Sequence, residues 1–212
     1  KLLVNWGSNT ANTNSHLWSL MVEARKRRGA TIVTVDPYRS PTAERSDWHV
    51  QPRPGTDAAL ALGLMHVIFR DGLEDRDYLE RATVGAPRLR ARVLEEYPPD
   101  RVAGITGVDV ATIEAFARRL ATEQPSLIRL NYGMQRVRGG GNAARAIACL
   151  PALVGAWRDR AGGLLLSSSG HYPVDRAALQ RADLLAGRKP RTINMSTIGD
   201  ALLDTANPVK AK

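Results

Sequence analysis

Residues 2–35 read LLVNWGSNTANTNSHLWSLMVEARKRRGATIVTV, with a strand pattern on either side of a helix pattern. The first run, Leu2–Trp6, is mostly apolar, and the second, Thr31–Val35, is rich in β-branched residues that favour strands. Between them, apolar residues recur at helical spacing as far as Gly29, a residue that suits the end of a helix. A strand, a helix and a second strand in this order predict a right-handed βαβ unit with parallel strands.

The rest of the chain repeats this alternation. Further strands are expected at residues 48–51 and 126–130, and further helices at residues 57–70, 75–81, 87–97, 109–122 and 142–157. This order predicts an α/β fold, an open and mostly parallel sheet with helices on both faces, of the Rossmann-like kind. Beyond Gly163 the sequence becomes rich in Ser and Arg and only weakly periodic. We therefore expect a Rossmann-like domain over residues 1–163 and an extension of loops and short helices over residues 164–212.

The composition limits the classes of partner. The 212 residues carry a formal net charge of +9, with 25 Arg and five Lys. Aromatic residues are scarce and do not alternate with basic clusters, so we expect no nucleic-acid partner. No apolar run approaches the ~20 residues that cross a bilayer, so no membrane span is expected. The compartment, cytoplasmic or periplasmic, stays open.

Metal and thiol chemistry is limited as well. Cys149 is the only cysteine, which excludes Cys-based iron–sulfur clusters and Cys-rich zinc sites within these residues. The four histidines are scattered, without the spacing of metal ligands. We therefore expect no metal ligand and no catalytic acid, base or nucleophile in this chain. Because it begins at Lys1 without Met, and residues 208–212 look like the approach to another strand, we expect a piece of a longer protein.

Polar segments follow the expected strands, and ligands of parallel sheets bind beyond the carboxyl ends of strands. Gly7, Ser8 and Asn9 follow the first strand, where small residues let backbone N–H groups approach a phosphate. Asp36 and Pro37 follow the second, where a carboxylate commonly accepts hydrogen bonds from ribose hydroxyls. Each segment also has an ordinary explanation, since such residues are common in turns and Asp-Pro reverses the chain direction.

The segment Gly55-Thr56-Asp57 lies where the helix of residues 57–70 is expected to begin. Backbone N–H groups at a helix start have no partner within the helix. The two oxygens of Asp57 can accept the N1–H and the 2-amino group of a guanine, or the carboxylate can simply interact with the helix dipole. After the strand at residues 126–130, Gln135 and Arg136 can approach a polar ligand, or they belong to a flexible loop before the next helix.

Together these segments resemble a known family. The runs WGSN, VDP, PGTDAAL, ITGV and YGMQR occur in the order and spacing of large subunits of the dimethyl sulfoxide reductase family; they are residues 6–9, 35–37, 54–60, 105–108 and 132–136. Those proteins are molybdenum or tungsten oxidoreductases that carry bis-molybdopterin guanine dinucleotide. The resemblance continues at Asp47, Gly155 and Gly162-Gly163, and in the tail at residues 200–203 and 207–211. As departures, Thr10 stands where the family usually has Pro, and the segment after Arg136 lacks the His-Gly-Glu-type residues of some sulfoxide reductases.

The resemblance implies a cofactor-binding set that comprises Trp6, Gly7, Ser8, Asn9, Asp36, Pro37, Gly55, Thr56, Asp57, Gln135 and Arg136. By resemblance, the loop at residues 7–9 lines the pyrophosphate of one guanine dinucleotide arm. Asp36 takes a ribose hydroxyl, residues 55–57 take the guanine, and residues 135–136 approach the pterin or the substrate funnel. The parent enzyme transfers an oxygen atom, or a hydride or electron pair, and this part alone is expected to be inactive. The metal ligand, any iron–sulfur cluster, the remaining domains and any electron-transfer subunit lie outside these residues.

Two other functions stay open at this stage. A structural subunit of respiratory complex I is a non-catalytic relative with the same fold, although a scaffold has no need of the guanine and ribose positions seen here. An ordinary NAD-binding Rossmann domain is the other option, and the missing GxGxxG fingerprint weighs against it.

Overall fold

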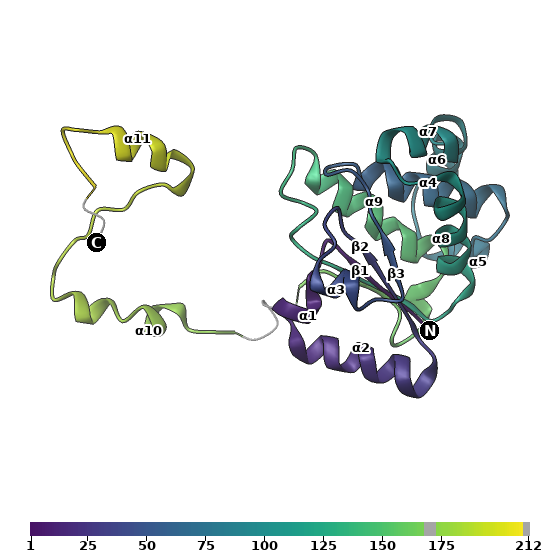
Figure 1. The fold of residues 1–212 in the computed structure, drawn as a ribbon, viewed down its shortest axis with the longest axis horizontal. Helices are drawn as coiled ribbons and strands as arrows, with labels where there is room; N and C mark the ends of the chain where they lie inside the picture. Colours follow the sequence, from purple (N-terminus) through teal and green to yellow (C-terminus); the bar gives the residue numbers. More distant parts are fainter. Residues whose placement is uncertain (168–172, 210–212) are drawn as a thin grey trace. The chain divides into compact units, whose positions relative to one another are not determined.

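The computed structural model describes residues 1–167 and 173–209. The chain divides into two compact units, Lys1–Ser168 and Ser169–Lys212. The first unit holds the sheet and nearly all of the buried apolar side chains, and most of its helices and strands are labelled in Figure 1. In the described part of the second unit, only Ala201 is a buried apolar residue. The first unit therefore contains the hydrophobic core.

In the described residues, five parallel strands form one sheet in the order β3-β2-β1-β4-β5. Their bounds are β1 Leu2–Trp6, β2 Thr31–Val35, β3 Trp48–Val50, β4 Ser126–Leu130 and β5 Gly163–Leu165. The central strand is β1, and its Trp6 pairs in register with Val35 of β2 and Leu130 of β4. The carboxyl ends of these three strands therefore lie side by side at one edge. The predicted α/β fold with a parallel sheet is confirmed.

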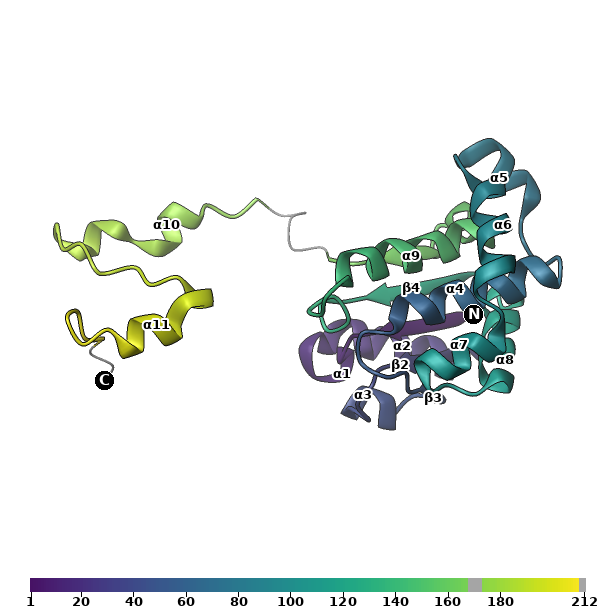
Figure 2. The ribbon, with the colours of Figure 1, turned by 90° about the horizontal axis from the view of Figure 1, so that it is seen from above.

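Helices cover both faces of the sheet (Figures 1 and 2). One face carries α1 Thr10–Thr13, α2 Ser15–Arg28 and α3 Pro41–Glu44. The other carries α4 Asp57–Arg70, α7 Pro99–Thr106, α8 Val110–Thr122 and α9 Gly140–Leu153. Two further helices, α5 Arg76–Ala82 and α6 Ala86–Glu96, pack against α9 and α4 respectively. As the sequence predicted, α2 ends where Gly29 adopts a left-handed conformation with φ 63°.

The main core lies between the sheet and α4. Alternate residues of β1 (Leu2, Val4 and Trp6) face it and are fully buried, as the two-residue period of a strand requires. The Trp6 ring lies 6.2 Å from that of Phe116 on α8, and the Trp48 ring lies 5.7 Å from the same phenyl group. This packing fixes the end of β1 against the helical layer that carries the start of α4.

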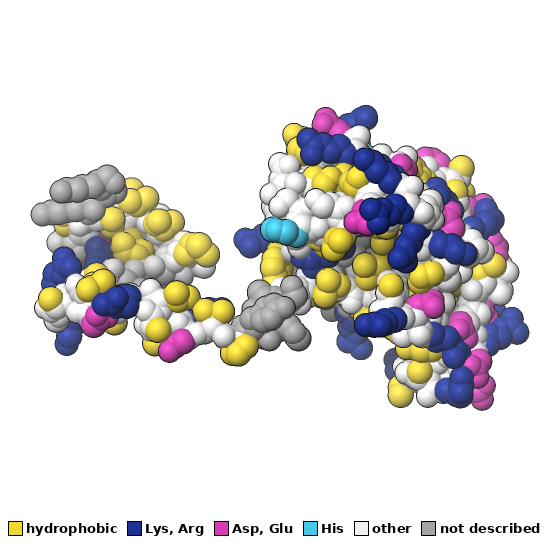
Figure 3. Space-filling view, turned by 90° about the horizontal axis from the view of Figure 1, so that it is seen from below, with side chains coloured by type: hydrophobic (Ala, Val, Ile, Leu, Met, Phe, Trp, Pro, Cys, Tyr) yellow, Lys and Arg dark blue, Asp and Glu magenta, His cyan; other side chains and the backbone are white. Residues whose placement is uncertain are grey.

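The arginines are dispersed among acidic side chains. Arg118 pairs with Asp71 at 3.0 Å, and Arg158 pairs with Asp75 at 2.8 Å. Figure 3 shows basic and acidic side chains interspersed on the face that it draws, rather than one continuous basic surface. Within the described residues, no helix combines the length and the apolar character needed to cross a membrane.

Among the described helices of the first unit, the four-residue α1 and α3 were not predicted from the sequence, and neither was α7, which is longer. The start and end of α7 explain why. It begins at Pro99 directly after Pro98 and ends at Gly107, which has φ 76°. Proline is compatible with the first turn of a helix because the missing N–H has no intrahelical partner there, so the Pro-Pro pair marks a helix start rather than a loop. The predicted helix at residues 142–157 is shorter at its end, because Gly155 takes a left-handed conformation and starts the 3₁₀ turn η1 at Ala156–Arg158.

The boundary expected at residue 163 stays a prediction, although β5 begins there and pairs with β4 through Leu165. In the second unit the described residues form α10 Arg176–Gln180, η2 Ala182–Leu185, η3 Met195–Thr197 and α11 Ile198–Leu203. Residues 210–212, part of the expected approach to another strand, lie outside the described residues.

Candidate functional site

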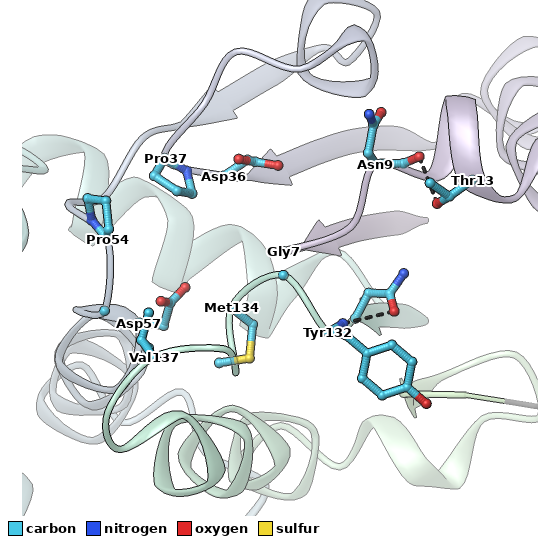
Figure 4. Close-up of a pocket in the computed structure, with 13 residues that line it drawn as sticks. Gly7, Asn9, Thr13, Asp36, Pro37, Pro54, Asp57, Tyr132, Met134 and Val137 are labelled. Atoms are coloured by element: carbon cyan, nitrogen blue, oxygen red, sulfur yellow. Dashed lines mark hydrogen bonds between the residues drawn. The ribbon is translucent and has the colours of Figure 1, made fainter. Parts of the chain in front are cut away.

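A cavity of about 470 Å³ opens where β1, β2 and β4 end and α4 begins (Figure 4). This volume is within the range of small-molecule sites. Several residues of the predicted set line its wall: Gly7, Asn9, Asp36, Pro37, Gly55 and Asp57. The loop after β4 contributes Asn131, Tyr132, Gly133, Met134 and Val137 to the same wall. Segments far apart in the sequence therefore share one cavity.

Asp57 is the first residue of α4 and is 5% exposed. Its Oδ1 accepts a hydrogen bond from the indole Nε1 of Trp6 at 2.8 Å. Figure 4 shows the carboxylate directed into the cavity. Burial raises the pKa of Asp57, the Trp6 hydrogen bond opposes that rise, and the charge of Asp36 adds to it. The cavity therefore holds a largely desolvated acceptor, and hydrogen bonds are stronger in such surroundings than in water.

Trp6 lies behind the wall rather than on it. Its side chain is fully buried, and its contact with the site is the hydrogen bond to Asp57, 51 residues later in the chain. Trp6 entered the predicted cofactor-binding set as part of the run WGSN, residues 6–9, that carries the family resemblance. The structure assigns it a contact with a wall residue instead.

Thr56 does not cap α4 with its side chain. Its Oγ1 donates to the backbone oxygen of Arg53 at 2.7 Å, which closes the turn around Pro54 and Gly55. The Arg53 backbone N–H donates to the oxygen of Thr106 at 2.7 Å, and its guanidinium donates to the oxygen of Gly104 at 2.7 Å. The turn that carries Gly55 is thus fixed to the carboxyl end of α7. Because α7 was not expected from the sequence, this contact was not predicted either.

The loops after β1 and β4 approach each other closely at two glycines. Gly7 has φ 58°, and a Cβ there would lie 2.7 Å from the backbone nitrogen of Met134. A Cβ on Gly133 would lie 2.7 Å from the backbone oxygen of Gly7. Gly7 N–H also donates to the oxygen of Val35 at 2.9 Å, so the three strand ends are joined through backbone contacts. Glycine is needed at position 7 for both its backbone conformation and its proximity to the neighbouring loop.

Asp36 is partly buried and faces the same cavity. Its Oδ1 accepts a hydrogen bond from the backbone N–H of Tyr38 at 2.9 Å. Burial raises the pKa of Asp36, while the Tyr38 hydrogen bond and the nearby His49 oppose that rise. Two carboxyl groups, those of Asp36 and Asp57, therefore offer acceptors at different points of one wall.

Other predicted residues lie off the wall. Ser8 is buried, and its hydroxyl is 2.9 Å from that of Thr10, within the loop after β1. Gln135 is partly buried and Arg136 is exposed, and neither lines the cavity. Tyr132, 41% exposed, lines it instead. Its place in the loop that follows β4 was the available signal, since ligands of parallel sheets bind beyond the carboxyl ends of the strands.

These features define a parallel α/β domain with a ligand-sized cavity at the carboxyl edge of its sheet. The model of the molybdopterin oxidoreductase family matches residues 1–204, and the chain belongs to this family. It is 42% identical over 211 residues to the probable oxidoreductase YoaE of Bacillus subtilis, covering 100% of this chain and 31% of that protein. It is 33% identical over 177 residues to dimethyl sulfoxide reductase DmsA of Escherichia coli, covering 73% of this chain and 22% of that protein.

The fold is likewise similar to a solved structure, that of acetylene hydratase from Pelobacter acetylenicus. The TM-score is 0.68 and the sequence identity 36%, over 76% of this chain and 22% of that chain. The chain thus spans about a third or less of the length of these relatives. The family implies a molybdenum or tungsten pterin cofactor.

Proposed function

We propose that this chain binds one guanine nucleotide arm of a bis-molybdopterin guanine dinucleotide cofactor, in a protein that catalyses oxygen-atom, hydride or electron-pair transfer. The observation that carries the proposal is the buried Asp57 carboxylate directed into the cavity beside a helix start. An ionised carboxylate only accepts hydrogen bonds. Guanine presents two adjacent donors, N1–H and the 2-amino group, whereas adenine presents an acceptor at N1.

The remaining wall fits the other parts of a nucleotide. Asp36 is placed to accept a ribose hydroxyl, a common role for a carboxylate after the second strand of such a sheet. We assign the diphosphate to the loop after β1, because its Gly7 and Asn9 line the cavity and small residues let a backbone approach a phosphate closely. Gln135 and Arg136 remain proposed contacts of the pterin end, since they follow this wall in the chain.

The cofactor, when bound, supplies the two-electron chemistry through its metal. The residues of this chain bind and orient one arm of it, and we assign none of them a catalytic role. The relatives include oxidoreductases and a hydratase, so the proposal names the cofactor arm and leaves the substrate open. The other arm, the metal ligand and any redox partner are proposed to belong to parts of the protein beyond these residues.

Calorimetric titration of this chain with GMP and AMP tests the proposal. We expect tighter binding of GMP, and we expect Asp57→Ala to abolish the preference. Asp36→Ala is the matched control. Loss of a ribose contact should weaken both nucleotides, and because the Asp36 charge opposes ionisation of Asp57, its removal should not reduce the guanine preference. Equal affinity of the unmodified chain for GMP and AMP would overturn the guanine assignment.

A further inference from the structure

We propose that Trp6 is the positioning residue that makes this cavity select guanine over adenine, by holding the Asp57 carboxylate in the orientation and charge state that a guanine edge requires. The inference rests on the proposed nucleotide site and adds a residue that touches no ligand. It starts from the hydrogen bond between Trp6 Nε1 and Asp57 Oδ1, at 2.8 Å between two buried side chains.

The indole is held rigidly. Trp6 is the last residue of β1, is fully buried, and packs against the Phe116 ring at a centroid distance of 6.2 Å. An indole Nε1–H donates and never accepts, so its partner oxygen must be an acceptor. The hydrogen bond therefore favours the ionised form of Asp57. It also fixes the orientation of the carboxylate through Oδ1, so that Oδ1 and Oδ2 can both accept hydrogen bonds from the two donors of a guanine.

The charge state of Asp57 decides which purine fits. A carboxylate matches the donors N1–H and 2-amino of guanine. A neutral carboxylic acid carries one donor, which matches the acceptor N1 of adenine and opposes the N1–H of guanine. Protonation of one Asp57 carboxylate oxygen would thus turn a guanine site into one that tolerates adenine.

The surroundings of Asp57 otherwise favour protonation. The titratable side chains on the cavity wall are Asp36, Asp57 and Tyr132, so no cation among the described wall residues offsets the buried charge. Burial and the Asp36 charge both raise the pKa of Asp57, and the Trp6 N–H is the first among the contacts that lower it, followed by the backbone N–H of Asp57 itself. The guanidinium of Arg53, in the turn before α4, donates to the carbonyls of Gly104 and Ile105 instead. Trp6 is therefore the side chain that keeps the acceptor ionised.

The test compares Trp6→Phe with Trp48→Phe. Both rings pack against Phe116, so the two variants remove a similar aromatic contact, while only Trp6 donates to Asp57. The affinities for GMP and AMP are measured from acidic to neutral pH. Loss of one hydrogen bond to a charged group changes an equilibrium about tenfold, so we expect the GMP preference of Trp6→Phe to fall about tenfold at mildly acidic pH. The pH at which the preference is half lost should also move upward, whereas Trp48→Phe should follow the unmodified chain.

A second measurement does not depend on the folding of Trp6→Phe. The indole N–H resonance of Trp6, one of four in the sequence, should shift with the ionisation of Asp57 and lose that titration in Asp57→Asn. If GMP is preferred but Trp6→Phe and Trp48→Phe have the same pH profile, or if the Trp6 resonance does not titrate, the inference is overturned and the guanine site stands. If the unmodified chain shows no preference at any pH, the proposed function itself fails, and this inference fails with it.

Discussion

Substitution of Gly7 by Ala tests the close approach between the loops after β1 and β4. Gly7 has φ 58°, and an added Cβ would lie 2.7 Å from the backbone nitrogen of Met134. A left-handed backbone conformation costs a residue with a side chain about 1–2 kcal/mol. Overpacking that displaces backbone costs about 1–3 kcal/mol more. We therefore expect Gly7→Ala to lower the free energy of unfolding by about 2–5 kcal/mol.

Gly29→Ala is the matched control. Gly29 has φ 63°, nearly the same conformation, but a Cβ there would meet no atom within 4 Å. Only the backbone cost of about 1–2 kcal/mol applies to it. The additional loss in Gly7→Ala, about 1–3 kcal/mol, is then the cost of separating the two loops.

Urea unfolding monitored by tryptophan fluorescence measures both variants, and equal m-values establish that the midpoints can be compared. Under native conditions Gly7→Ala should also bind GMP more weakly, because Gly7 lines the cavity, whereas Gly29→Ala should bind it normally. Equal losses of stability in the two variants would refute the contact between the loops.

Two further predictions concern the start of α4. Arg53→Ala should lose about 0.5–1.5 kcal/mol of stability and weaken GMP binding, because the turn before Asp57 loses its side-chain contact with α7 and keeps only the backbone bond to Thr106. Arg101→Ala removes a comparable side-chain bond, to the oxygen of Glu96 at 2.7 Å, and should leave GMP binding unchanged in the same titration. Asp57→Asn should be more stable than the unmodified chain at neutral pH in urea unfolding. The pKa of Asp57 is higher in the folded than in the unfolded state, so ionisation of Asp57 lowers the free energy of unfolding as the pH rises. Asn does not ionise, so the stability difference in favour of Asp57→Asn must grow from acidic to neutral pH. An advantage that shrinks with rising pH would contradict the cause assigned to that pKa.

Local patterns were sufficient to predict the framework of the fold. Apolar periodicity and the glycine after α2 predicted the first βαβ unit, because a strand or helix buried on one face must repeat its own period. The start of α4 followed from the Pro-Gly turn before Asp57. In contrast, α7 was not predicted, because a Pro98-Pro99 pair is as typical of a loop as of the start of a helix.

The site was predicted as a set of segments rather than as contacts. That Asp36 and Asp57 would share a cavity followed from strand ends meeting at one edge of a parallel sheet. The Trp6–Asp57 hydrogen bond joins residues 51 positions apart, and no local pattern encodes such a distance. The position of Tyr132 on the wall, with Gln135 and Arg136 off it, depends on how the loop after β4 packs against Gly7. Such packing follows from three-dimensional contacts, which spacing along the chain does not determine.

The most direct test of the guanine site is a change of base preference in Asp57→Asn. An amide retains one acceptor and replaces the other by a donor, which matches xanthine, where N1–H remains and a carbonyl oxygen replaces the 2-amino group. The affinities of the unmodified chain and of Asp57→Asn for GMP and for xanthosine monophosphate are measured by calorimetry. We predict that the unmodified chain prefers GMP and that Asp57→Asn prefers the xanthine nucleotide. If both proteins show the same preference, Asp57 does not distinguish the two bases, and the assignment of this cavity as a guanine site is contradicted.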